Sequence, residues 1–138
     1  VQPAMIALFL LYTAWQASTV HPYYLDYYSE AVGGTYPSWK HRRFEVGWWG
    51  EGMNVAVDYV NKNADPGDTW ECYGVVNHTV DGIRTDISRV KKNAKWLITG
   101  YVRAGREVRK GYEEVHRVEL QNAPLAIVYR RLEDKPSE

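Results

Sequence analysis

The chain opens with a long apolar stretch. Residues 4–17 are almost wholly apolar, and only Thr13 and Gln16, both near the end of the run, interrupt them. Ala, Leu, Met and Ile favour helix, and Pro3 is tolerated in a first helical turn. The pattern predicts one apolar helix over residues 1–20. Its length is marginal for a bilayer, whose hydrocarbon core takes about 20 apolar residues.

Three interpretations of this helix compete. A signal peptide needs a basic segment ahead of its apolar run, and no Lys or Arg precedes this one. A core helix of a soluble domain fits the short length. We favour the end of a transmembrane helix whose start precedes Val1. Tyr12 and Trp15, followed by a dense tyrosine cluster, resemble the aromatic belt at a membrane–water boundary.

Residues 21–52 show neither helical nor strand periodicity, and we expect an irregular linker there. The segment holds five Tyr and three Trp. Pro22 and Pro37 disfavour helix, and Gly33 and Gly34 permit backbone angles that other residues avoid. So many aromatic rings must pack on something. We expect either a loop wrapped on the following domain or a linker lying in the headgroup region of a membrane.

Residues 53–138 alternate between helical and strand patterns, which predicts a small α/β domain. We expect helices over 53–64, 80–93 and 104–114, and strands over 69–76, 95–102, 115–121 and 125–132. The short turn at 122–124 makes the last two strands an antiparallel hairpin. The predicted fold is a mixed sheet of about four strands with covering helices, in which 95–102 is central and 115–121 is outer.

Charge excludes one class of function. Lys plus Arg equals Asp plus Glu, at 17 each, which argues against a nucleic-acid binder because phosphate contacts need clustered excess cations. The charge is uneven along the chain. Residues 1–68 carry four basic and seven acidic side chains, and residues 69–138 carry thirteen and ten. Both signs are interspersed, which favours a mixed solvated surface over a patch for anionic lipid.

Motifs for nucleotide, metal or nucleophilic chemistry are missing from the sequence. The four histidines show no metal-ligand spacing, and we expect no metal, no cofactor and no catalytic residue here. Cys72 lies in an apolar strand and is expected to be a buried small hydrophobe. The triplet 77–79 matches a glycosylation acceptor. One enzymatic alternative pairs Glu51 with His41, and it needs both within hydrogen-bond reach of one substrate atom.

Two aromatic and glycine-rich motifs carry a family resemblance. Residues 21–28, HPYYLDYY, followed by Val32-Gly33-Gly34, and then residues 47–52, GWWGEG, running into a helix, resemble motifs near the carboxyl end of GT-C membrane glycosyltransferases. The closing segment 126–132 is similar as well. The nearest relatives are the dolichyl-phosphate-mannose protein mannosyltransferases and the aminoarabinose transferases. The resemblance covers residues 5–132, although Ser29 stands where the family often has Asn, and 103–109 departs from its pattern.

The resemblance implies a function and a location. Such enzymes transfer a sugar from a polyprenyl-phosphate donor on the extracytoplasmic side of a membrane, and their catalytic carboxylates lie between early transmembrane helices, outside this sequence. The resemblance divides the chain into the end of a last transmembrane helix (1–20), a membrane-surface linker (21–52) and a soluble domain (53–138). The soluble domain would cap the active-site side or help to position the acceptor or the lipid donor. The expected contacts to lipid or substrate are Tyr23, Tyr24, Tyr27, Tyr28, Trp48, Trp49 and Glu51. The alternative is a free-standing soluble binding domain with residues 1–20 in its core.

Overall fold

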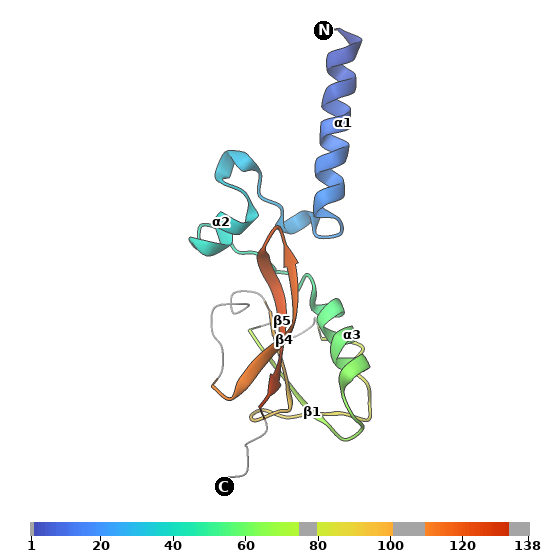
Figure 1. Ribbon diagram of the computed structural model, residues 1–138, viewed down its shortest axis with the longest axis vertical. Coiled ribbons are helices and arrows are strands. Elements are labelled where there is room, and N and C mark those ends of the chain that lie inside the picture. Colours follow the sequence, from blue (N-terminus) through green and yellow to red (C-terminus); the bar gives the residue numbers. More distant parts are fainter. Residues whose placement is uncertain (1, 75–79, 101–109, 133–138) are drawn as a thin grey trace.

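A computed structural model describes residues 2–74, 80–100 and 110–132. Helix α1 extends away from the remainder of the chain, and the two termini lie at opposite ends of the molecule (Figure 1). The helices are α1 (Pro3–Val20), the short 3-10 helices η1 (Tyr24–Asp26) and η2 (Glu30–Val32), α2 (Thr35–Lys40) and α3 (Met53–Asn63). The predicted apolar helix is therefore present, but the linker is only partly irregular, since it forms three short helices.

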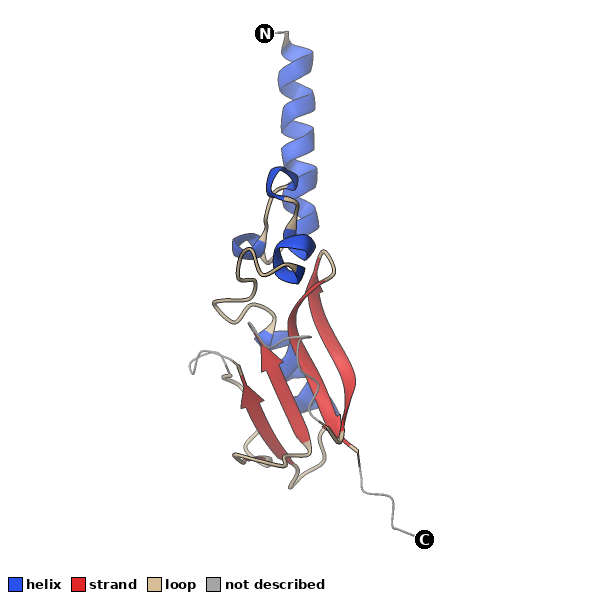
Figure 2. Cartoon of the chain, turned by 90° about the vertical axis from the view of Figure 1, so that its left-hand side faces the viewer, coloured by secondary structure: helices blue, strands red, loops and turns tan. Residues whose placement is uncertain are grey.

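Five strands form one mixed sheet, which confirms the predicted fold class (Figure 2). The strands are β1 (Thr69–Tyr73), β2 (Ser88–Arg89), β3 (Trp96–Gly100), β4 (Tyr112–Leu120) and β5 (Ala123–Arg131). Their order is β2-β1-β3-β5-β4. Strands β2, β1 and β3 run parallel, and β5 is antiparallel to both β3 and β4. As predicted, β3 is central, β4 is outer, and the chain ends in an antiparallel hairpin.

Helix α3 covers one face of the sheet. Its apolar residues recur at helical spacing on one side, because Met53, Ala56, Val57 and Val60 are all buried while Asn54 and Asp58 are exposed. They pack on alternate residues of the strands, including Trp70, Trp96, Ile98, Val118, Ala126 and Val128. The side chains between them point to the opposite face, where Leu97, Tyr112, Ile127 and Tyr129 form a separate buried cluster.

The helix predicted over 80–93 is wrong. The chain there forms no helix, and only β2 is regular. Asn61, on α3, donates to the carbonyl of Gly82 at 2.7 Å and accepts from the backbone N–H of Arg84 at 3.0 Å. The Arg84 guanidinium in turn donates to the carbonyls of Asn61 and Ala64, at 2.9 and 3.0 Å. These bonds hold the segment along the end of α3, and they replace the hydrogen bonds that a helix would make.

The end of the helix predicted over 104–114 is also wrong, since β4 already begins at Tyr112. Residues 101–109, and the acceptor triplet at 77–79, lie outside the described residues. The hairpin turn lies one residue earlier than predicted. Gln121 and Asn122 both have positive φ, at 48° and 68°, as a two-residue hairpin turn of right-handed twist requires.

The linker and the end of α1 pack on the tip of this hairpin. A second apolar cluster joins Val20 of α1 and Val46 of the linker to the hairpin residues Leu120, Ala123 and Leu125. Linker aromatics border it, namely Tyr23, Tyr27, Tyr28 and Trp39. The base of α1 is thereby fixed to the domain, while the remainder of α1 is not.

Candidate membrane-surface site

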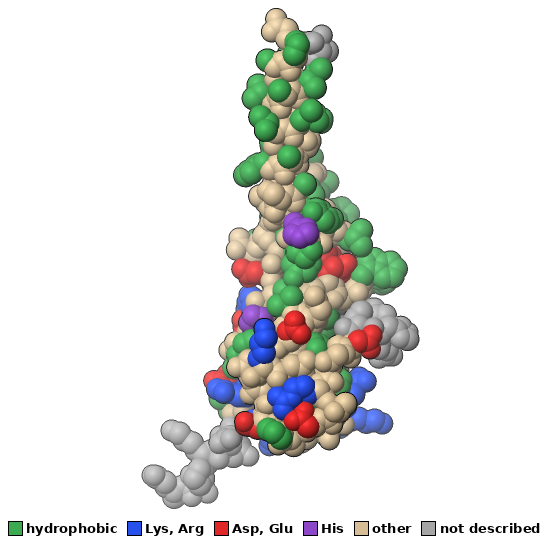
Figure 3. All heavy atoms as spheres, turned by 90° about the vertical axis from the view of Figure 1, so that its right-hand side faces the viewer, with side chains coloured by type: hydrophobic (Ala, Val, Ile, Leu, Met, Phe, Trp, Pro, Cys, Tyr) green, Lys and Arg blue, Asp and Glu red, His purple; other side chains and the backbone are tan. Residues whose placement is uncertain are grey.

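Helix α1 is apolar on every side and almost fully exposed. Val20 is its only buried residue. Its large apolar side chains are 52–67% exposed, from Met5 to Trp15. Figure 3 shows charged side chains over the lower domain and none on this helix. By length and composition, α1 is the one helix of the described residues that is able to cross a membrane. The packing of residues 1–20 in the core of a soluble domain, the alternative considered above, is not seen within the described residues, where Val20 alone of α1 is buried.

A polar cluster surrounds the last turns of α1. The side-chain amide of Gln16 donates to Tyr12 Oη at 2.8 Å and to Glu30 Oε1 at 3.2 Å, and the Tyr27 hydroxyl donates to Glu30 Oε2 at 3.1 Å. The pKa of Glu30 lies below its usual range, because its own backbone N–H and then Gln16 and Tyr27 stabilise the ionised form. An ionised carboxylate is thus held beside α1, one turn before the helix ends.

Two carboxylates accept hydrogen bonds from the backbone of the loop 47–52. Asp26 Oδ1 accepts the backbone N–H of Gly47 at 2.6 Å, and Glu51 Oε2 accepts the backbone N–H of Trp49 at 3.0 Å. A hydrogen bond from a backbone N–H to an ionised carboxylate is charge-assisted and stronger than one to a neutral acceptor. The two bonds satisfy backbone donors that the irregular loop leaves free. The loop is therefore fixed while it presents Trp48 and Trp49 outward, at 44% and 70% exposed.

Asp26 is a buried carboxyl group beside this loop. Its side chain is buried, and its Oδ2 has no hydrogen bond of regular geometry. Burial raises the pKa of Asp26 to about 6, with the charge and hydrogen bonding of Glu51 adding to the rise and the Gly47 N–H opposing it. The two motifs that carry the family resemblance meet at this pair, since Asp26 belongs to the first and Glu51 to the second.

An open hollow of about 460 Å³ lies beside this loop. We call it the aromatic hollow, and its lining residues are Leu25, Asp26, Tyr28, Arg43, Phe44, Glu45, Trp48 and Trp49. The rings of Tyr28 and Phe44 stack with centroids 4.9 Å apart and planes inclined by 10°. The Tyr28 hydroxyl donates to the carbonyl of Glu45 at 2.6 Å. These contacts fix one wall of the hollow.

The seven interface residues predicted from the sequence fall into three groups. Tyr28, Trp48 and Trp49 line the aromatic hollow, and Glu51 supports its loop. Tyr24 and Tyr27 line a second groove, between the linker and the last turns of α1. Tyr23 instead packs inward between the two apolar clusters.

The enzymatic alternative gains no support from the geometry. Within the described residues no hydrogen bond joins Glu51 to His41, and His41 is an exposed residue at the end of α2 that does not line the aromatic hollow. Cys72 is half-buried against the main core, and burial raises the pKa of its thiol to about 11. A thiol with that pKa is not a nucleophile at neutral pH.

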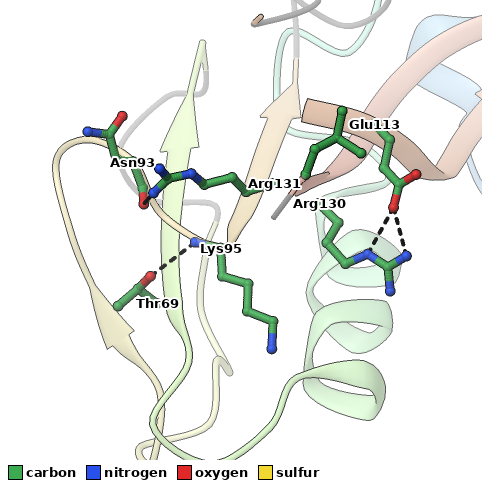
Figure 4. A pocket seen from close by; sticks show the side chains of 7 residues that line it. Thr69, Asn93, Lys95, Glu113, Arg130 and Arg131 are labelled. Atoms are coloured by element: carbon green, nitrogen blue, oxygen red, sulfur yellow. Dashed lines mark hydrogen bonds and ion pairs between the residues drawn. The ribbon is translucent and has the colours of Figure 1, made fainter. Parts of the chain in front are cut away.

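A larger hollow, of about 620 Å³, lies near the amino end of β3 and the carboxyl end of β5 (Figure 4). Its cations are engaged by the protein itself. Arg130 pairs with Glu113 at 2.7 Å, and Lys95 pairs with Asp68 at 2.9 Å, outside the set drawn. Arg131 donates to the carbonyl of Asn93 at 3.2 Å. Exposed pairs of this kind belong to a solvated surface.

The variant Asp26→Asn tests the account of the buried carboxyl. An aspartate with a native pKa of about 6, against about 3.9 when unfolded, costs the native state about 3 kcal/mol once both states are ionised. Because the native pKa is the higher one, wild-type stability falls as pH rises from about 4 to about 6 and is then constant. The amide oxygen still accepts from Gly47 without a charge. Near pH 7.5 we expect the variant to unfold at a higher temperature than wild type, with a free energy of unfolding that is higher by about 1–2 kcal/mol.

Thermal unfolding followed by tryptophan fluorescence, in a zwitterionic detergent, measures this difference. Asp26→Ala is the matched control. It removes the same charge but also the acceptor of the buried Gly47 N–H, and we expect it to be about 2 kcal/mol less stable than Asp26→Asn. The account fails if wild type and Asp26→Asn lose the same stability between about pH 4 and about pH 6.

Four residues of the site were not among the interface residues predicted from the sequence, namely Asp26, Arg43, Phe44 and Glu45. The only signal for Asp26 is a single acidic residue within an aromatic motif. The other three become neighbours of the tryptophans only when residues 25–49 fold back on themselves. Comparison of the chain with protein-family models, with curated proteins and with solved structures finds no match. The GT-C resemblance therefore stays a prediction that depends on the motif residues.

Proposed function

We propose that this chain is a membrane-anchored, non-catalytic surface domain of a glycosyltransferase that uses a polyprenyl-phosphate sugar. Helix α1 carries the proposal. A helix that is apolar on all sides is stable in a protein core or in lipid, and α1 contributes only Val20 to a core. Lipid is the remaining solvent that suits its surface. The glycosyltransferase part, and an extracytoplasmic location, depend on the family resemblance.

The polar cluster at the base of α1 sets the depth of insertion. The ionised Glu30 carboxylate, bonded to Gln16, costs about 2.5–3.5 kcal/mol if moved to the bilayer centre. The boundary of the hydrocarbon therefore lies on the far side of Gln16. On this proposal residues 3–11 lie in hydrocarbon, and Tyr12 and Trp15 lie at the boundary, where aromatic side chains are enriched. Nine helical residues span about 13 Å.

The linker then lies at the membrane surface, with the sheet beneath it. Val20, Val46 and the hairpin tip form one apolar cluster, so the domain is held close to the end of α1. Exposed aromatic and apolar side chains of the linker, among them Tyr24, Leu25, Phe44 and Trp49, are suited to headgroups or to a lipid-linked substrate. On this proposal the domain positions a substrate and provides a contact surface for it, and the catalytic groups belong to other parts of the glycosyltransferase.

Two measurements on the 138-residue chain in phosphatidylcholine vesicles test this proposal. We expect alkaline carbonate to leave the chain in the membrane fraction, whereas release into the supernatant would contradict an anchor. We also expect no turnover of a polyprenyl-phosphate hexose in the presence of hydroxyl acceptors. Release of the hexose by this chain alone would contradict the non-catalytic role.

A further inference from the structure

We propose that the aromatic hollow binds a pyranose ring. This inference deepens the proposed function, since it gives the non-catalytic domain a ligand of its own. It stands on the lining of the hollow. Its volume of about 460 Å³ lies within the range of about 300–1,000 Å³ that small-molecule sites occupy.

The ring of Phe44 forms the platform. Tyr28 covers one of its faces in a nearly parallel stack, yet Phe44 remains 44% exposed and lines the hollow, so part of its ring is accessible to a ligand there. The face of an aromatic ring carries negative charge density. The axial C–H groups of a pyranose carry partial positive charge on a flat face of similar size, which suits this contact. Because Tyr28 is bonded to the carbonyl of Glu45, the platform is formed before a ligand arrives, and little ordering cost remains.

Polar groups of both kinds lie around this platform. The guanidinium of Arg43 offers donors, and the carboxylate of Glu45 offers acceptors. Both residues line the hollow, and within the described part of the chain neither side chain makes a hydrogen bond or an ion pair. A sugar hydroxyl donates and accepts at once, so it satisfies both groups. Such charge-assisted bonds are stronger than bonds between neutral partners.

The charges around the hollow favour a neutral ligand over an anion. Among the described residues that line it, Arg43 is the only cation, against the carboxyl groups of Glu45 and Asp26. A phosphate or a carboxylate would meet a net negative lining. A plain acyl chain would leave the guanidinium and the carboxylate without partners. A neutral polyol with one apolar face fits both the platform and the polar groups.

Saturation-transfer NMR on the full chain in phosphatidylcholine nanodiscs tests the assignment. The probes are the methyl pyranosides of glucose, galactose, mannose and N-acetylglucosamine. We expect saturation of the ring protons of at least one probe. Phe44→Ala should weaken its binding about fivefold to tenfold. Arg43→Gln, an exposed change that keeps the fold, should weaken binding to a similar extent. Tyr36→Ala is the control, since Tyr36 is 37% exposed on α2 and lies outside the hollow.

No saturation of any of the four probes overturns the inference, as does binding that neither Phe44→Ala nor Arg43→Gln weakens. Nanodiscs that contain a monoglycosyl diacylglycerol distinguish the source of the sugar. Competition with the methyl pyranoside indicates a lipid-linked ring, and lack of competition indicates a free one. The carbonate extraction described above fails or succeeds independently, so loss of the membrane anchor and loss of the sugar site are separate results.

Discussion

Two arginines in the exposed apolar helix are expected to remove the chain from membranes. Leu8 and Phe9 lie on different sides of α1, at 67% and 65% exposed. Replacing an apolar residue by Arg costs about 3 kcal/mol at the bilayer centre, and less where Leu8 and Phe9 lie, within about 6 Å of the boundary at Tyr12. The double variant Leu8→Arg with Phe9→Arg should lower partition into phosphatidylcholine vesicles by roughly a hundredfold or more, measured by flotation. Neither residue belongs to a core cluster, so we expect thermal unfolding of the domain to be unchanged.

The control places the same two charges on α3. Asn54 and Val55 are exposed there, and Asn54→Arg with Val55→Arg adds equal charge without touching α1. We expect this control to float as wild type does. If the α1 variant floats equally well, α1 is not the membrane anchor and the proposed function loses its basis.

The second large effect is expected from Gly52→Ala. Gly52 immediately precedes α3, as its N-cap, with a φ of +79°, and a Cβ at this position would lie 2.8 Å from Val118 Cγ1 and 3.2 Å from Leu125 Cβ. A left-handed alanine costs about 1–2 kcal/mol, and overpacking adds about 1–3 kcal/mol. We expect a loss of about 4 kcal/mol in the free energy of unfolding, a large share of the stability of a small domain.

Gly67→Ala separates the two causes. Gly67 also has a positive φ, of +87°, but nothing lies within 4 Å of its Cβ position. It should lose only about 1–2 kcal/mol. Denaturant unfolding of both variants measures the comparison. Equal losses of unfolding free energy at the two positions would mean that the close approach of Gly52 to the hairpin does not contribute to the effect of Gly52→Ala.

The spacing of apolar residues along the chain correctly predicted those helices and strands whose own side chains pack in the core. Helix α3 and strands β3 and β5 follow from periodicity, because their apolar residues face the core directly. The segment 80–93 shows why a pattern can mislead. Val80, Ile83, Ile87 and Val90 recur at helical spacing, yet the first three pack in or against the core from a segment that forms no helix. The hydrogen bonds from Asn61 and Arg84 that decide this span more than 20 residues of sequence.

The candidate site was predictable in part for the same reason. Aromatic composition pointed to Trp48, Trp49 and the tyrosines. It gave no sign that Asp26 supports the loop at Gly47, 21 residues later. The sequence also did not separate the three tyrosines that line a hollow or groove from Tyr23, because all four occur in one motif. Only the folded linker distinguishes them.

The central claim is that α1 lies in lipid while the domain lies in water. Spin labels at Leu8→Cys and Asn54→Cys, each in a Cys72→Ser background, test it in phosphatidylcholine vesicles. The account predicts that the label at position 8 is relaxed by oxygen and shielded from a water-soluble nickel complex, and that the label at position 54 shows the reverse. A label at position 8 as accessible to the nickel complex as the label at position 54 would contradict it.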